Sequence, residues 1–322
     1  MNNPRYQHTA TVLSDGRVFV AGGFSAGGPT NGAELYNSSS GIWTSTTNMN
    51  YRRSGHSASL LTNGAILIAG GSNNTEYHTS AEKYDVSATN WTFVGSMNAA
   101  RFFHTASVLS DGTVLVTGGK SPFALSSAEL YNPSSGMWTS IANMSYARAE
   151  HVATVLNNGQ VLVTGGFNGF VAHNSAELYN SSSGIWIAVG NMSTSRYGHT
   201  ASLLFDGTVL VTGGYFGINA TNSVELYDPS TKRWTTLTSM SFRRGGHVAS
   251  VFSNGKVLVT GGWFNSISLS STELYDPSTN TWTIIDSMNY AREMPILSEL
   301  NDGRLLITGG YSGSTLSSAE LY

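Results

Sequence analysis

The chain repeats one glycine pair seven times at a nearly constant interval, and this spacing constrains the fold more than any other feature. The pairs are 47 or 48 residues apart and stand at positions 22–23, 70–71, 118–119, 165–166, 213–214, 261–262 and 309–310. The third copy of the surrounding unit reads "RFFHTASVLSDGTVLVTGGKSPFALSSAELYNPSSGMWTSIANM". A fixed period of this length predicts an architecture in which each repeat is one supersecondary unit.

A short turn motif precedes every glycine pair. It separates two apolar, β-branched runs and occurs at Asp15-Gly16, Asn63-Gly64, Asp111-Gly112, Asn158-Gly159, Asp206-Gly207, Asn254-Gly255 and Asp302-Gly303. Asp-Gly and Asn-Gly in this context predict two-residue β-hairpins, because a type I′ turn needs two residues at positive φ. The whole chain is therefore predicted to be all-β.

Each unit contains four expected strands. In the third copy these are residues 105–109, residues 114–117, the "SAELY" of residues 127–131 and a stretch around Trp138. Units of this kind, repeated around an axis, predict a seven-bladed β-propeller of four-stranded antiparallel blades, as one domain over residues 1–322. An open β-solenoid is the alternative, but its coils are usually shorter and lack internal Asp-Gly hairpins.

The order of the repeated residues carries a family resemblance. A Gly-Gly pair, the Glu and Tyr of "AELY", and a Trp seven residues later resemble the kelch repeat, and the pattern extends from Arg5 to Tyr322. The resemblance implies a seven-bladed kelch propeller whose successive strands run from the central channel to the rim. The form with "HTASVL", "VLVTGG" and "ELYDPS" is similar to kelch-like repeats of many large bacterial and invertebrate proteins, which mostly act as binding modules of unknown ligand.

The seventh unit differs from the others at its end. Nothing after Tyr322 corresponds to the "NPSSGMW" of residues 132–138. We therefore expect the seventh blade to lack its outermost strand, which leaves an unpaired edge at the rim. We also expect this chain to be part of a longer protein whose flanking sequence carries the missing strand.

One Arg and one Glu recur in every unit, although charged residues make up only 11% of the chain. The two sets are Arg5, Arg53, Arg101, Arg148, Arg196, Arg244 and Arg292, and Glu34, Glu82, Glu129, Glu177, Glu225, Glu273 and Glu320. We predict that they pair within or between blades, because a part-buried charge without a partner is costly. Resemblance to kelch propellers that bind acidic peptides implies the alternative, in which arginines face a ligand.

Tryptophan and histidine also recur. We predict that Trp43, Trp91, Trp138, Trp186, Trp234 and Trp282 pack between neighbouring blades. Six histidines head the first strands, and Pro295 stands in the seventh unit; they are His8, His56, His104, His151, His199 and His247. A metal site would need their side chains to converge, but packed sheets lie about 10 Å apart. A structural hydrogen bond to a neighbouring loop is the better prediction.

The units differ most between the second and third expected strands, so we expect function there. The residue after the glycine pair is aromatic in five of the seven units: Phe24, Phe167, Tyr215, Trp263 and Tyr311. Either these rings pack under their own loops, or they form an aromatic rim with nearby arginines that binds a sugar or an extended peptide. The candidate ligand-binding residues are Phe167, Tyr215, Phe216, Trp263, Phe264, Tyr311, Arg148, Arg196, Arg244 and Arg292.

An enzymatic role is disfavoured, and no catalytic or metal-binding residues and no cofactor are predicted. The nearest enzyme class is the copper-radical oxidase represented by galactose oxidase, whose cofactor is a tyrosine cross-linked to a cysteine. This chain has no cysteine and no Ser-x-Asp-x-Gly-x-x-x-Trp box of the sialidase type. Glu150 and Glu293, each within two residues after the repeat Arg, could serve acid–base chemistry but equally suit loop positions.

Composition narrows the range of partners. A net charge of −3 and the absence of Lys or Arg runs argue against nucleic-acid binding. No apolar stretch is long enough for a membrane-spanning helix. Low charge and missing cysteine favour an extracellular location only weakly. The prediction is a non-catalytic interaction module that binds a protein segment or a carbohydrate.

Overall fold

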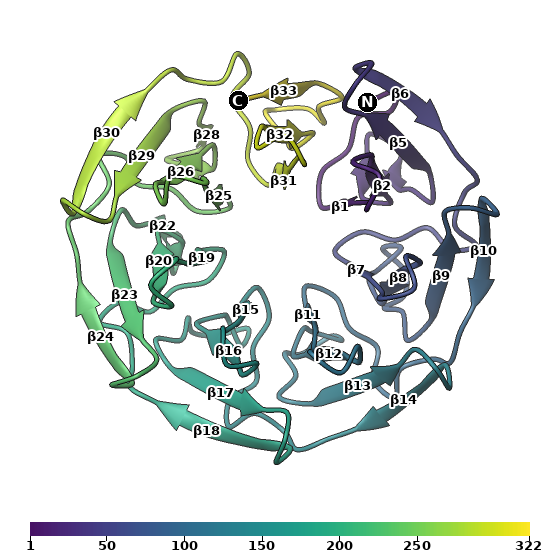
Figure 1. Ribbon diagram of the computed structural model, residues 1–322, viewed down its shortest axis with the longest axis horizontal. Coiled ribbons are helices and arrows are strands. Elements are labelled where there is room, and N and C mark those ends of the chain that lie inside the picture. Colours follow the sequence, from purple (N-terminus) through teal and green to yellow (C-terminus); the bar gives the residue numbers. More distant parts are fainter.

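A computed structural model describes all residues 1–322 as a ring of seven antiparallel sheets around a central channel (Figure 1). Within each sheet the strands follow chain order from the channel to the rim. The predicted all-β, seven-bladed propeller is confirmed. None of its elements is a helix long and apolar enough to cross a bilayer.

The first four blades have four strands each. Their bounds are β1 (Thr9–Val12), β2 (Val18–Ala21), β5 (Ala33–Asn37) and β6 (Ile42–Ser45); β7 (Ser57–Leu60), β8 (Ile66–Ala69), β9 (Ala81–Asp85) and β10 (Asn90–Phe93); β11 (Thr105–Val108), β12 (Val114–Thr117), β13 (Ala128–Asn132) and β14 (Met137–Ser140); β15 (Val152–Val155), β16 (Val161–Thr164), β17 (Ala176–Asn180) and β18 (Ile185–Val189).

The remaining blades follow the same plan, except that the seventh has three strands. Their bounds are β19 (Thr200–Leu203), β20 (Val209–Thr212), β23 (Val224–Asp228) and β24 (Arg233–Thr236); β25 (Val248–Val251), β26 (Val257–Thr260), β29 (Thr272–Asp276) and β30 (Thr281–Ile285); β31 (Ile296–Glu299), β32 (Leu305–Thr308) and β33 (Ala319–Leu321). Three small hairpins lie in the connecting loops: β3 (Phe24–Ser25) with β4 (Gly28–Pro29), β21 (Tyr215–Phe216) with β22 (Asn219–Ala220), and β27 (Trp263–Phe264) with β28 (Ile267–Ser268).

The Asp-Gly and Asn-Gly motifs close hairpins, but not of the predicted type. In the first blade Leu13 N–H donates to Arg17 O at 2.8 Å, and Gly16 N–H donates to Leu13 O at 2.9 Å. Of the turn residues only Gly16 has positive φ, at 82°. This is a three-residue loop, a type I turn followed by a left-handed glycine, rather than a two-residue type I′ turn. The type I′ prediction is wrong, and the hairpin prediction holds.

The hydrophobic core lies between blades. All four residues of each second strand are buried, as in Val114–Thr117 of β12. Each Trp packs at a tilt against the Tyr of its own third strand, with ring centroids 4.9–5.0 Å apart. Five of the six indole N–H groups donate to a carbonyl of the preceding blade, which confirms the predicted packing between blades.

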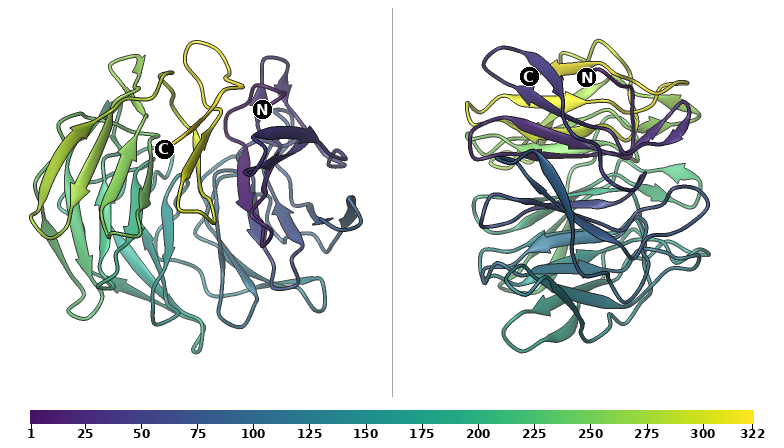
Figure 2. Two further views of the ribbon diagram at one scale, coloured as in Figure 1. Left: turned by 45° about the horizontal axis from the view of Figure 1, so that its top comes forward. Right: turned by 90° about the vertical axis from the view of Figure 1, so that its right-hand side faces the viewer.

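The glycine pairs hold each blade against the next. The second glycine donates its N–H to the carbonyl of the next repeat Arg, for example Gly119 to Arg148 at 2.9 Å. The first glycine leaves no room for a side chain, since a Cβ at Gly118 would lie 2.4 Å from Arg148 O. The same contact closes the ring, because Gly310 N–H donates to Arg5 O at 3.0 Å. The side view in Figure 2 places both termini at this junction.

The seventh blade confirms the expected three strands and leaves β33 at the rim. The side chain of Glu320 on β33 is 10% exposed, while its counterparts are at most 1% exposed. Trp43 of the first blade is also the one repeat Trp whose indole N–H has no acceptor in the protein. The other five donate to a carbonyl in the segment that follows the fourth strand of the preceding blade, and the seventh blade has no fourth strand. Both features follow from the open edge.

Candidate functional site

The repeat arginines form buried ion pairs and do not belong to a ligand site. In all seven blades the Arg Nη2 atom lies 2.5–3.0 Å from the Oε1 atom of the repeat Glu. The predicted pairing is confirmed. Every repeat Arg is fully buried, so the ligand-facing alternative is wrong for Arg148, Arg196, Arg244 and Arg292. Their guanidinium groups have no exposed atoms with which to touch a carboxylate ligand.

Each glutamate also fixes the segment that leads into its blade. Glu129 accepts the N–H of Asn98 at 2.7 Å and that of Ala99 at 3.1 Å, in addition to the Arg101 guanidinium at 2.8 Å. Burial by itself would raise the pKa of Glu129, but these hydrogen bonds outweigh it and leave the pKa below its ordinary value. The Arg–Glu network is therefore structural, and it neutralises the charge that the repeat places in every blade.

The histidines connect adjacent blades. Each Nε2 atom lies 2.8–3.1 Å from a Ser or Thr hydroxyl of the preceding blade, and the pair His8 and Thr308 joins the first blade to the seventh. The predicted structural hydrogen bond is confirmed, although its partners lie on innermost or second strands rather than on loops. Burial lowers the pKa of His8 and of His104 to about 3. Nowhere do three His, Asp or Glu side chains come together as metal ligands.

The variable segments lie on one face, which we call the loop face. There the residue after each glycine pair forms a β-bridge with the residue after the repeat Arg, as in Tyr215 with Tyr197. Each bridge joins two segments of one blade, and rings on these segments also contact rings of neighbouring blades. Tyr197 lies between Phe167 and Tyr215, at centroid distances of 5.1 and 5.3 Å, and Trp263 follows at 6.1 Å from Tyr215.

The other predicted aromatics lie elsewhere on this face. Tyr311 packs on Tyr6 of the first blade at 5.5 Å, and Phe24 packs on the same ring at 5.4 Å. Phe216 is exposed on the tip of its hairpin, and Phe264 is half-buried. The predicted rim is thus divided into two aromatic arcs, of which the arc over blades four to six borders a pocket.

This aromatic pocket measures about 470 Å³ and is lined by residues of blades four to seven: Glu150, Tyr197, Tyr215, Ile218, Trp263, Glu293 and Met294. Its shape depends on glycine. Tyr215 lies against the backbone of Gly245, where an added Cβ would come within 2.4 Å of its Cζ atom. A Cβ at Gly246 would meet the Tyr215 hydroxyl at 3.3 Å and the Met294 side chain at 3.5 Å. Any larger residue at these positions would displace the ring.

The pocket adjoins a ring of left-handed residues at the mouth of the central channel. The residue before each repeat histidine position has a φ between 49° and 61°, and six backbone hydrogen bonds of 2.8–3.1 Å connect these residues from blade to blade. They are Gln7, Gly55, Phe103, Glu150, Gly198, Gly246 and Met294. A left-handed residue with a Cβ costs roughly 1–2 kcal/mol. Blades five and six have glycine here, so the pocket opens beside them, between the side chains of Glu150 and Met294.

The charges at this pocket are acidic. Burial raises the pKa of Glu150, an effect that Lys120 only partly offsets from 3.8 Å away. Burial likewise raises the pKa of Glu293. Tyr215 also has a raised pKa, first because it is buried and then because Glu293, Tyr197 and Glu150 are close to it. Both glutamates were candidate acid–base residues in the sequence, with no predicted connection to the aromatic residues.

Sequence reasoning missed Tyr197, Ile218 and Met294. A signal was available for two of them: the two positions after the repeat Arg change from unit to unit, while the Arg itself never does. These positions bear Tyr197 in blade five and Glu293 with Met294 in blade seven. Ile218 lies at a hairpin tip and had no comparable signal.

Around the pocket, the loop face carries exposed apolar side chains at the ends of its loops. We call Phe123, Phe170, Phe216, Ile218 and Ile267 the apolar loop tips; they are 60–87% exposed. They come from blades three to six, the part of the ring that also provides most of the pocket. Large exposed apolar residues gathered on one face are typical of an interaction surface.

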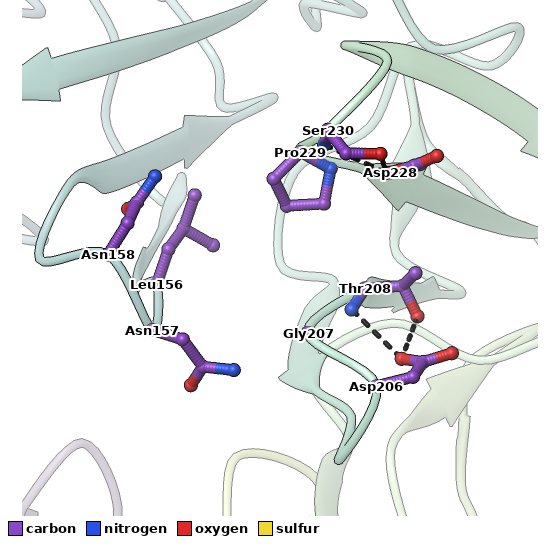
Figure 3. A pocket seen from close by; sticks show the side chains of 9 residues that line it. All are labelled: Leu156, Asn157, Asn158, Asp206, Gly207, Thr208, Asp228, Pro229 and Ser230. Carbon is purple, nitrogen blue, oxygen red and sulfur yellow. Dashed lines mark hydrogen bonds between the residues drawn. The ribbon is translucent and has the colours of Figure 1, made fainter.

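The opposite face bears polar clefts that arise from the repeat itself. One, of about 360 Å³, lies between the turns of blades four and five and is shown in Figure 3. Its Asp206 side chain accepts hydrogen bonds from the backbone and hydroxyl of Thr208, and Asp228 does the same for Ser230. A similar cleft follows between blades five and six. These acceptors serve their own turns, so the loop face is the better candidate site.

Comparison with known proteins agrees with this architecture. The KLHDC2/KLHL20/DRC7 Kelch-repeats domain matches the chain over residues 1–166 and again over residues 142–310. The chain therefore belongs to the kelch-repeat propeller family. No curated protein matches it.

Among solved structures, a fungal alcohol oxidase of the AA5 family, determined in complex with copper, has the same fold. Its TM-score is 0.79 at 19% identity, over 96% of this chain and 71% of the oxidase chain. The residues of the present chain do not fit a copper centre of the kind described above. Cysteine is absent, and the repeat histidines are buried in hydrogen bonds between blades. The likeness concerns the fold.

Proposed function

We propose that this kelch propeller is a non-catalytic interaction module whose loop face binds a segment of another protein. The observation that carries the proposal is the set of apolar loop tips, which are 60–87% exposed on the same face as the aromatic pocket and of which Ile218 lines the pocket. Aromatic and aliphatic anchors of this kind contribute most of the binding energy at protein interfaces. The kelch family, which serves mainly in binding, supports the same role.

Carbohydrate binding is the second candidate, because aromatic rings beside carboxylates also suit a sugar. Phe167, Tyr197 and Trp263 offer ring faces, and Glu150 and Glu293 offer hydrogen-bond acceptors. The exposed aliphatic tips at Ile218 and Ile267 favour a protein segment, since a sugar has little apolar surface to cover them.

A random peptide library and a glycan array, both probed with the purified chain, test the proposal. We expect peptides to be selected, and we expect the double variant Phe170→Ser/Ile218→Ser to bind them at least tenfold more weakly. Phe205→Ser is the matched control, because Phe205 is 71% exposed but lies beside an Asp-Gly turn on the opposite face. Saturable binding to glycans alone, or peptide binding that both variants retain, would contradict the proposal.

A further inference from the structure

The aromatic pocket has the walls of a cation-binding site. The rings of Tyr197, Tyr215 and Trp263 come from two adjacent blades and form a row. The centroid of Tyr215 lies 5.3 Å from that of Tyr197 and 6.1 Å from that of Trp263. Aromatic faces attract ammonium and guanidinium groups through the ring quadrupole, most strongly where water is excluded. Ile218 and Met294 complete the lining with aliphatic surface, which suits the methylene stem of a long side chain.

The charges of the pocket also favour a cation. Glu150 and Glu293 reach it from blades four and seven, and no Lys or Arg lines it. Lys120 is the only cation paired with either carboxylate, with its Nζ 3.8 Å from Glu150. That Nζ also lies over the rings of Phe102 and Phe103, and the Lys120 side chain is one-third exposed. Glu293 has no ion pair. The repeat arginines add no positive charge, because each is paired with its own glutamate.

An unpartnered polar group points to the same ligand. Tyr215 is more than nine-tenths buried, and its hydroxyl has no hydrogen-bond partner within the protein, whereas the hydroxyl of Tyr197 donates to Gly217 O at 2.8 Å. The hydroxyl oxygen itself keeps some solvent-accessible surface, so it is open to a ligand in the pocket. Because Tyr215 lines the pocket close to both carboxylates, its oxygen is available to accept a hydrogen bond from a bound N–H donor.

We propose that this pocket binds the cationic end of a lysine or arginine side chain in an extended segment of a partner protein. The inference rests on the proposed function and specifies its anchor. The charge complementarity is opposite to that of a propeller whose exposed arginines bind acidic peptides. A peptide is favoured over a free amine because the exposed loop tips Phe216 and Ile218 adjoin the pocket and offer surface to the residues flanking the anchor.

Host peptides of the form acetyl-Gly-Ala-X-Ala-Gly-amide, titrated into the purified chain and followed by NMR, test the inference. X is lysine, arginine, norleucine or glutamate, and n-butylammonium serves as the free amine. We expect the lysine and arginine peptides to bind at least tenfold more tightly than the norleucine peptide, which has an apolar stem of similar length without charge. The glutamate peptide should not bind.

Variants distinguish the effect of the pocket carboxylates on peptide binding from the effect of the protein's net charge. Glu150→Gln and Glu293→Gln should each weaken the lysine peptide at least fivefold, while Lys120→Met should strengthen it by removing the competing ammonium. Glu76→Gln is the matched control, because Glu76 is an exposed acid in a blade-two loop outside the pocket. An equal loss in all the glutamine variants would mean that only bulk charge acts, and would overturn the inference.

The outcomes distinguish the inference from the proposed function. If the lysine and norleucine peptides bind equally and binding depends on Phe170 and Ile218, the loop face binds peptides but the cation anchor is wrong. If n-butylammonium binds as tightly as the lysine peptide, the pocket is a small-amine site and the peptide assignment is wrong. If no probe binds, the inference fails, and the library selection decides the proposed function on its own.

Discussion

Replacing Glu129 by glutamine removes one charge from a buried ion pair and changes almost nothing else. The carboxylate is 1% exposed and accepts four hydrogen bonds of 2.7–3.1 Å, two on each oxygen. Arg101 and the Ala99 N–H share Oε1, while the backbone and side chain of Asn98 share Oε2. An amide has one acceptor oxygen, so its NH₂ group must face two donors on one side or the other.

The size of the effect follows from this geometry. Two hydrogen bonds to a charged acceptor are lost, at roughly 1.5–3 kcal/mol each. The buried Arg101 also loses its counter-charge, and breaking a buried pair from one side costs about 3–5 kcal/mol in total. We therefore expect Glu129→Gln to lower the free energy of unfolding by about 3–5 kcal/mol. Glu320→Gln, in the seventh blade, should cost less because water reaches that carboxylate.

Urea denaturation, followed by circular dichroism, measures the difference. Asp15→Asn is the control, because it breaks an ion pair to Arg17 of similar length, 2.7 Å against 2.8 Å, in which the Asp15 and Arg17 side chains are 48% and 35% exposed. Asparagine already fills the equivalent turn position in three other blades. Solvent screening should limit its cost to less than about 1 kcal/mol. If Glu129→Gln cost no more than Asp15→Asn, the network would be an ordinary surface pairing and the reasoning would be refuted.

Three further predictions concern the contacts between blades. The free energy of unfolding should fall as the pH drops from about 6.5 towards 3. Burial lowers the pKa of His8 and His104 in the folded protein to about 3, whereas in the unfolded chain these histidines take up protons at their ordinary pKa. Below about pH 6, each of the two histidines should lower the free energy of unfolding by about 1.4 kcal/mol per pH unit. Urea midpoints that stay level between pH 7 and 5 would contradict this. Gly118→Ala should lower the free energy of unfolding by more than about 2 kcal/mol, because its Cβ would lie 2.4 Å from Arg148 O at a φ of 58°. Gly136→Ala, which has a φ of 68° and open space around it, should lower it only by the left-handed strain of about 1–2 kcal/mol. Similar urea midpoints for the two variants would refute the steric argument. Appending "NPSSGMWTSIANMS" after Tyr322 should raise the urea midpoint, because it can pair with β33 and cover Glu320; no gain would show that the edge needs no fourth strand.

Most of the fold could be predicted because each unit repeats the same local signals. The glycine pairs, the alternation of apolar residues and the Arg and Glu of each unit all point to blades that dock in one way. The turn type was wrong because Asp-Gly fits both a two-residue and a three-residue hairpin. What decides between them is whether Leu13 pairs with Arg17, and this depends on strand register rather than on the turn residues.

The site was harder to predict than the fold because its residues are not close in sequence. Tyr215 and Trp263 could be found from their place after the glycine pair, yet Tyr197 joins them only through a bridge between segments 18 residues apart. Four arginines were candidate ligand contacts in the sequence, but full burial assigns them to the scaffold. Sequence position gives the face on which a side chain starts, whereas packing decides whether it reaches solvent.

The electrostatic character of the loop face depends on the difference between the repeated, buried charges and the unrepeated ones. Because seven Arg–Glu pairs neutralise each other inside the blades, the repeat leaves the face almost neutral. A few unrepeated residues therefore set its electrostatic character, and in the aromatic pocket these are Glu150 and Glu293. Both lie within two residues of a repeat Arg, at positions whose backbone is fixed by hydrogen bonds and whose side chains are free to differ. In a propeller of this kind, we expect exchange of one such side chain to alter what the pocket can bind and to leave the contacts between blades intact.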